Sequence, residues 1–128
     1  MFNFKEVAKK VADNNSFIMA GREKLGLDEL ISRYPDGVTV IGADLLKGQH
    51  GEYAAGIYAE EEGFYFNGGK AFTDIVREWS AGYVAEGQTI PDMEQMTADL
   101  TECGGVKMRF EKTKTQSGNN FTKVEVLD

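Results

Sequence analysis

Hydrophobic residues recur with the spacing of a helix in two stretches before residue 37. Phe4, Val7, Ala8 and Val11 fall at positions i, i+3, i+4 and i+7, which predicts a helix over about residues 3–13. A second, shorter helix is predicted over residues 27–31, before a Pro-Asp-Gly turn. We expect both helices to cover a sheet. For the first helix, a dimer or partner surface is the alternative.

The hydrophobic period changes to two at Val38, which is typical of strands. Three apolar or aromatic runs follow one another, separated by short polar turns that contain glycine. Turns of this length require antiparallel neighbours, so the runs predict a three-stranded meander. The strands are predicted from residue 38, over residues 53–60 and over residues 64–66, with turns at residues 47–51, 61–63 and 67–69.

Two helices and a hairpin are predicted after the meander. Phe72, Ile75, Val76 and Trp79 recur at helical spacing, which predicts an amphipathic helix. Pro91 suits the first turn of a further helix. Alternating apolar and polar residues then predict a C-terminal hairpin. The helices are predicted over residues 70–81 and 92–100, and the hairpin over residues 106–126 with its turn at residues 116–120.

The order strand, strand, strand, helix, strand, strand is that of the OB-fold, a partly open five-stranded Greek-key barrel. We therefore predict a single α+β, mostly β domain over residues 1–128. In it, a helical segment (1–36) precedes a five-stranded antiparallel OB-like barrel (37–128). A plain α+β sheet with two or three helices on one face would give the same order of elements and is the alternative.

The middle of the chain also resembles a known group of proteins. The run FYFNGGKAFTDIV at residues 64–76, preceded by Gly51-Glu52-Tyr53, is similar to the small single-stranded DNA-binding proteins of bacterial viruses and prophages. The resemblance extends over about residues 38–127. It implies an OB-fold in which an aromatic strand and a Gly-Gly turn precede the barrel helix, and in which a basic strand pair ends the chain. It also implies that the chain binds single-stranded DNA.

Composition excludes several classes of protein. The chain has 128 residues, 15 glycines, no Gly-X-Y repeat, no sustained heptad and no apolar run long enough to span a membrane. Its single cysteine cannot form an internal disulfide, and residues 1–6 lack the basic and apolar regions of a signal peptide. We therefore expect a cytoplasmic protein with no membrane partner.

Charge is distributed unevenly along the chain. The formal net charge is −7, yet residues 105–123 contain five basic residues and one acid. Such asymmetry indicates either a basic binding face on an acidic body or lysines that are merely solvated on an exposed hairpin. The five basic residues are Lys107, Arg109, Lys112, Lys114 and Lys123.

The sequence offers no convincing catalytic or metal site. Gly69-Lys70 lacks the remainder of a phosphate-binding loop, and the single histidine, His50, and the single cysteine, Cys103, are not a pair by sequence. They are also too few for a structural zinc site. The acids at residues 60–62 lie in a turn, where hydration is the ordinary state of such side chains. We expect no enzyme activity, no cofactor and no metal.

These observations predict a non-catalytic module that binds single-stranded nucleic acid, of phage or prophage type. A basic groove would follow the phosphates while aromatic rings stack on bases. The alternative is an acidic protein-interaction module, such as an inhibitor, an adaptor or a mimic of nucleic acid. The choice of DNA or RNA and the number of copies that assemble are left open. The expected binding residues are the five bases above and the aromatic residues Tyr53, Tyr58, Phe64 and Tyr65, of which Tyr65 is the first choice for stacking.

Overall fold

The sequence forms six strands and three helices within the residues that the structure describes. The structure is a computed structural model, and it describes residues 4, 16–49, 51–88, 90–114, 116–118 and 120–127. The predicted helix over residues 3–13 lies outside this part of the chain, except for Phe4. The elements are β1 (Glu23–Lys24), α2 (Leu27–Arg33), β2 (Val38–Gly48), β3 (Gly51–Tyr58), β4 (Phe64–Asn67), α3 (Gly69–Ala81), α4 (Met93–Glu102), β5 (Val106–Lys114) and β6 (Asn120–Val126).

The strands form one mixed sheet in the order β1-β4-β3-β2-β5-β6. The predicted meander β2-β3-β4 and the C-terminal hairpin β5-β6 are present, and β5 pairs with the other edge of β2. All of these pairs are antiparallel. The α+β class is therefore confirmed, as are the positions of the five predicted strands and of α2, α3 and α4.

The predicted five-stranded antiparallel barrel is not what the described residues form. The sheet has a sixth strand, β1, which pairs in parallel with β4, and it does not close into a barrel. The backbone of Glu23 and Leu25 donates hydrogen bonds to Gly63 and Tyr65, so β1 occupies the edge of β4 that a closing strand would need. The segment at residues 16–36 also contains this strand and is therefore not helical throughout.

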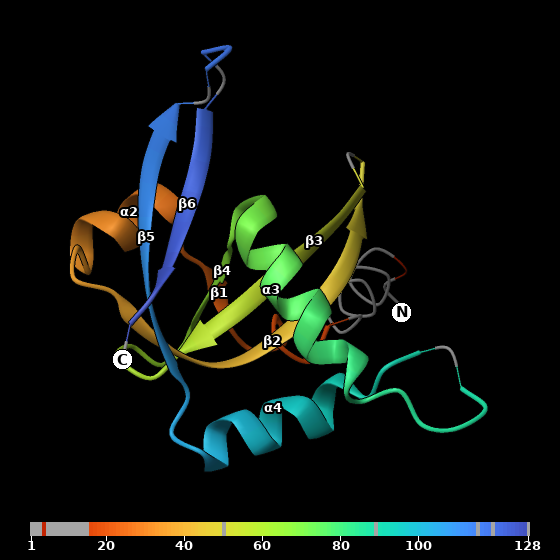
Figure 1. Ribbon diagram of the computed structural model, residues 1–128. Helices are drawn as coiled ribbons and strands as arrows, with labels where there is room; N and C mark the ends of the chain where they lie inside the picture. Colours follow the sequence, from red (N-terminus) through yellow and green to blue (C-terminus); the bar gives the residue numbers. More distant parts are fainter. Residues whose placement is uncertain are drawn as a thin grey trace.

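The sheet bends so that two hairpins diverge from a common base. Figure 1 shows the β2-β3 hairpin and the β5-β6 hairpin projecting to the same side, with α3 between them and α4 across the base. A register shift between Val40 and Gly42 interrupts the β2-β3 ladder, as expected where a strand bends. We call the two projecting hairpins the β2-β3 arm and the β5-β6 arm.

The main core lies between the sheet and α3. Three rings from three different elements meet there, namely Phe66 from β4, Phe72 from α3 and Phe110 from β5. The ring centroid of Phe66 lies 5.2 Å from that of Phe72 and 5.2 Å from that of Phe110, and the centroids of Phe72 and Phe110 are 5.8 Å apart. Tilted and edge-on rings at such distances attract one another in addition to being removed from water. This cluster joins β4 and the β5-β6 arm to α3.

A second, smaller core lies on the other face of the sheet. Ile18, from the segment before β1, is fully buried against Ala55 and Ile57 of β3. Ser16 holds this segment in place, because its hydroxyl donates to Asp44 of β2 at 2.9 Å. Burial raises the pKa of Asp44, although that hydrogen bond opposes the shift. Both faces of β3 are therefore covered.

The start of α3 depends on two adjacent glycines. A Cβ on Gly68 would lie 2.2 Å from a ring carbon of Phe72, which leaves no room for a side chain. Gly69 has a φ of +80°, which other residues rarely adopt. The Gly-Gly sequence thus lets α3 begin directly at the end of β4. By contrast, α4 has an ordinary cap, in which Asp92 accepts a hydrogen bond from the backbone of Gln95.

We expect Phe66→Ala to lower the free energy of unfolding by about 3–5 kcal/mol, because it removes a fully buried ring from the centre of the core. Urea denaturation followed by circular dichroism measures this. The control is Ile90→Ala, at a side chain that is 79% exposed, where we expect a change within about 0.5 kcal/mol. Equal effects of the two substitutions would contradict the described core.

Candidate nucleic-acid interface

The basic residues expected to form one stripe are divided between the two faces of the β5-β6 arm. Successive residues of a strand point to opposite faces. Lys112 and Lys114 lie on the face that contains the core residue Phe110, whereas Lys107 and Arg109 lie on the other face. Lys123 joins the latter face, because it pairs with Glu111. The basic stretch seen in the sequence is therefore not a single surface.

We call the face of the β5-β6 arm that contains Phe110 its inner face and the opposite face its outer face. Acidic residues offset bases on the outer face. The pairing of β5 with β6 sets Glu125 opposite Arg109, and their side chains form an ion pair. The same register sets Glu111 opposite Lys123. On the inner face, Lys112 forms a 3.3 Å ion pair with Asp28 of α2, whose side chain is 87% exposed. Lys114 lies opposite Asn120 and pairs with no acid among the described residues.

Tyr58 is part of the core and does not offer its ring to a ligand. Its side chain is 2% exposed and its ring lies 6.0 Å from that of Phe66 and 5.7 Å from that of Tyr34. Its hydroxyl donates to Glu61 at 2.9 Å. Burial and this hydrogen bond raise the pKa of Tyr58 far above its ordinary value. We therefore remove Tyr58 from the candidate stacking residues.

Phe64 and Tyr65 are half-buried on opposite faces of β4. Phe64 packs against the main core, and the guanidinium of Arg33 lies 5.6 Å from its ring centroid. Tyr65 packs against the second core around Ile18. Both rings are therefore held partly in place by the protein, and Phe64 also lines a hollow beside Glu61 and Glu62.

Tyr53 lines open hollows next to α3, whereas Phe64 and Tyr58 line a separate hollow of about 420 Å³ beside Glu61 and Glu62. Tyr53 lies on β3 beyond the end of β4, because the last pair of that ladder is Ala55 with Asn67.

Tyr53 is half-buried and lines two hollows, one of about 410 Å³ between β3 and α3 and one of about 390 Å³ toward the β2-β3 turn. Its side chain is on the face of β3 that carries Ala55 and Ile57, and its strand partner is Leu46. Lys70 and Arg77 line the first hollow, and Asn67 lines the second.

Two features beside Tyr53 suit a polar ligand. The side-chain oxygen of Asn67 is buried and has no hydrogen-bond partner among the described residues. The N-cap of α3 is Gly68, which has no side chain to cap the helix, and the first turn contains no acid. The amino end of a helix carries a partial positive charge and free N–H groups. Unlike a fully capped helix end, this one keeps those groups available to a ligand.

The amino end of α3 connects Tyr53 with the inner face of the β5-β6 arm. On one side, the Thr73 hydroxyl accepts a hydrogen bond from the backbone N–H of Ala54, next to Tyr53. On the other side, a Cβ on Gly69 would lie 3.5 Å from Cβ of Thr122, which is the strand partner of Lys112. We call this region the inter-arm surface. It consists of Tyr53, Asn67, Gly69, Lys70, Thr73, Arg77, Lys112, Lys114 and Thr122.

Charge on the inter-arm surface is more balanced than its four cations suggest. Lys70 forms an ion pair with Asp74, and Arg77 forms ion pairs with Asp74 and Glu52. The Lys70 ammonium lowers the pKa of Asp74, so this carboxyl is ionised at neutral pH. Exposed ion pairs of this kind are weak. A phosphate can therefore replace a carboxylate as the partner of Lys70.

The three consecutive glutamates at residues 60–62 include two with structural roles. Glu60 accepts hydrogen bonds from the backbone and hydroxyl of Thr39. Glu61 accepts hydrogen bonds from Tyr34, Tyr58 and Arg33. Burial opposes ionisation of Glu61, but these donors outweigh it and hold the pKa of its carboxyl below the usual value. Glu62 is exposed.

The residues considered in the sequence for catalysis or metal binding are not brought together in the part of the chain that the structure describes. No group of three or more His, Cys, Asp or Glu side chains could hold a metal ion in this part of the chain. Cys103 is exposed and its thiol donates to the backbone of Leu100. His50 lies outside the described residues. Of the helices that the structure describes, none has the length and hydrophobicity needed to cross a membrane.

Comparisons with known proteins find no match, whether with models of protein families, with curated proteins or with solved structures. The function proposed below therefore depends on the geometry of the chain itself and on the resemblance noted in its sequence.

Sequence reasoning missed Asn67, Lys70 and Thr73 as parts of a candidate site. Their signal was present, because the Asn-Gly-Gly-Lys sequence places an amide and an ammonium on either side of a helix start. From the sequence alone, this run indicates a turn and lacks the remainder of a phosphate-binding loop. The meeting of this turn with Thr122, more than fifty residues later, follows from the fold alone.

We expect Glu61→Ala to lower the urea midpoint of unfolding, because it leaves the partly buried hydroxyls of Tyr34 and Tyr58 without their shared acceptor. Glu62→Ala is the matched control and should leave the midpoint unchanged. If the two variants unfold at the same urea concentration, the hydrogen bonds described for Glu61 make no contribution to stability.

Proposed function

We propose that this chain binds single-stranded nucleic acid on the inter-arm surface, without catalysis, as the small single-stranded DNA-binding proteins of bacterial viruses and prophages do. The observation that carries the proposal is the position of Tyr53. Tyr53 lines two open hollows, one of which it shares with Lys70, Arg77 and the first residue of the uncapped helix α3. Single strands are held by just this combination of stacking rings and positive charge.

The order of strands supports the same proposal. Without β1, the sheet order is β4-β3-β2-β5-β6, with α3 and α4 between β4 and β5 in sequence. This is a meander followed by two helices and a hairpin that pairs back onto the first strand of the meander. We propose that β2 to β6 are an open form of the OB-fold, whose ligands bind on its second and third strands and on the loops that join strands one to two and four to five. Tyr53 and Asn67 lie on the corresponding second and third strands.

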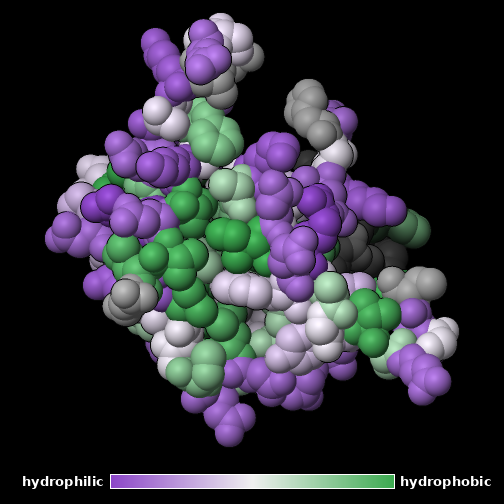
Figure 2. All heavy atoms as spheres, viewed as in Figure 1, coloured by the Kyte–Doolittle hydropathy of each residue, from purple (hydrophilic) through white to green (hydrophobic). Residues whose placement is uncertain are grey.

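The bases of the β5-β6 arm contribute unequally in this proposal. Lys112 and Lys114 lie on the inner face, next to the amino end of α3, and would contact phosphates there. Lys107, Arg109 and Lys123 lie on the outer face, where Glu125 pairs with Arg109 and Glu111 lies opposite Lys123. On the inner face, a phosphate at Lys112 would replace Asp28 as its partner. Figure 2 shows hydrophilic side chains near the tips of both arms. The strand would therefore pass between the arms and not along the outside of the hairpin.

The role of Tyr53 is tested by fluorescence anisotropy with a labelled dT oligonucleotide of about 20 nucleotides. We expect Tyr53→Ala to weaken binding by about 1–3 kcal/mol and to leave the dependence of log K on log salt unchanged, because a ring stacks on a base without releasing counterions. Tyr53→Phe keeps the ring and should retain most of the affinity. No binding by the unmodified chain, even at about 50 mM salt, would refute the proposed function.

The role of the inner face is tested by a pair of double variants that remove the same charge. We expect Lys112→Ala with Lys114→Ala to reduce the salt slope by about 0.7 for each lost phosphate contact. Lys107→Ala with Lys123→Ala removes two lysines from the outer face and should change the slope less. The reverse result would place the nucleic acid on the outer face of the arm.

A further inference from the structure

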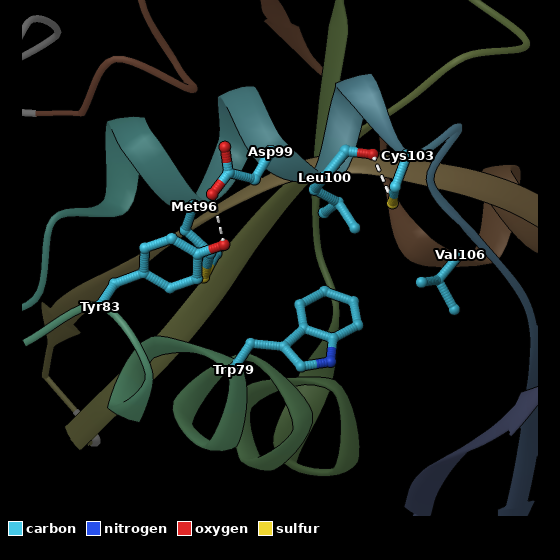
Figure 3. Close-up of a pocket in the computed structure, with 7 residues that line it drawn as sticks. All are labelled: Trp79, Tyr83, Met96, Asp99, Leu100, Cys103 and Val106. Atoms are coloured by element: carbon cyan, nitrogen blue, oxygen red, sulfur yellow. Dashed lines mark hydrogen bonds between the residues drawn. The ribbon is translucent and has the colours of Figure 1, made fainter.

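A cavity of about 340 Å³ lies between α3 and α4, at the opposite end of α3 from the inter-arm surface. Figure 3 shows Trp79 from α3 facing Leu100 of α4, with Tyr83 at one end of the cavity and Val106 at the other. Volumes in this range hold a large side chain or a small ligand. The cavity is lined by Trp79, Tyr83, Met96, Asp99, Leu100, Cys103 and Val106.

Two polar groups in the walls of this cavity already have hydrogen-bond partners within the protein. The Tyr83 hydroxyl donates to Asp99 at 2.8 Å, and the Cys103 thiol donates to the backbone oxygen of Leu100 at 3.1 Å (Figure 3). The hydrogen bond to Asp99, together with burial, raises the pKa of Tyr83, so the hydroxyl stays a donor at neutral pH. What remains for an occupant is the surface of Trp79, Met96 and Leu100.

The chain that forms the cavity is acidic in sequence: Asp99 lines the cavity, and Glu78 and Glu102 adjoin the lining residues Trp79 and Cys103. From Glu78 to Val106 the chain contains six acidic residues and neither lysine nor arginine. Two apolar side chains of the loop between α3 and α4 are also exposed, Val84 at 42% and Ile90 at 79%. The α4 edge appears hydrophilic at the base of the molecule, and hydrophobic side chains gather above it beside α3 (Figure 2). The acids are Glu78, Glu86, Asp92, Glu94, Asp99 and Glu102.

We propose that this cavity docks a basic polypeptide segment that inserts one large apolar side chain between Trp79 and Leu100. Lysine or arginine residues on either side of that anchor would face the acidic residues next to the cavity, such as Glu78 and Glu102. Binding through one buried anchor with a charged rim is a common design of protein interfaces. The charge makes the occupant basic, since an acidic peptide or a nucleic-acid strand would be repelled. This surface is independent of the proposed nucleic-acid binding.

The chain carries two natural reporters for this cavity, because Trp79 is its single tryptophan and Cys103 its single cysteine. The probe is a synthetic peptide, GKKFKKG, added to the full chain at low salt. We expect a shift of the Trp79 emission to shorter wavelength and slower reaction of Cys103 with a thiol reagent. The peptide GKKAKKG lacks the anchor and should bind about tenfold or more weakly, since a buried phenyl ring accounts for at least that factor. The acidic peptide GEEFEEG should not bind.

Two variants test the charged rim without altering the cavity. Glu102→Lys reverses one charge beside Cys103, and Glu62→Lys makes the same change of net charge on the exposed β3-β4 turn. We expect Glu102→Lys to weaken GKKFKKG by about two- to fivefold, the range of an exposed ion pair, and Glu62→Lys to have less effect. Thermal unfolding of both variants checks that each is folded.

Three results would overturn the proposal. Equal affinity for GKKFKKG and GKKAKKG would show general attraction to an acidic protein and no anchor in the cavity. Equal affinity for GKKFKKG and GEEFEEG would show that charge has no part. A chain that sediments as a dimer, and whose Cys103 is already unreactive before any peptide is added, would assign the cavity to a second copy of the chain.

Discussion

The contact among Phe66, Phe72 and Phe110 determines how the rest of the molecule is arranged. The three rings come from β4, α3 and β5, and β3 and β2 separate β4 from β5 in the sheet. Rings on strands so far apart can meet only if the sheet bends around them. That bend makes the two arms diverge, and Phe72 fixes α3 between them. The inter-arm surface is thus a consequence of core packing and needs no separate scaffold.

The two ends of α3 offer opposite chemistry. Its amino end has no acidic cap and lies among Lys70, Lys112 and Lys114. Its carboxyl end leads into a stretch that contains acids and no bases. A net charge of −7 therefore describes neither end, because it averages a mixed polar surface with a strongly acidic one. Nucleic acid and a basic segment could occupy the two ends at the same time without competing for the same residues.

Much of the fold could be predicted from the sequence, because the spacing of hydrophobic residues and the composition of turns depend only on residues that are close together in the chain. The meander, the two long helices and the C-terminal hairpin each depend on residues that are close in sequence. β1 could not be predicted, since Glu23 and Lys24 form a strand only because the edge of β4 is available to them. The same limit applies to the site. That Glu125 offsets Arg109 follows from hairpin register, and that Tyr53 is half-buried while Tyr58 is fully buried follows from the face and the position that each occupies on β3.

The pairing of β2 with β5 also determines when the molecule can be completed during synthesis. Val38 lies near the beginning of the described sheet and its partner Met108 near the end of the chain. One edge of β2 therefore has no strand partner until the last hairpin has left the ribosome, and contacts this distant in sequence slow folding. The same hairpin brings Phe110 to the core and Lys112 to α3. Until it docks, the nascent chain exposes a hydrophobic strand edge and has neither its full core nor its inter-arm surface.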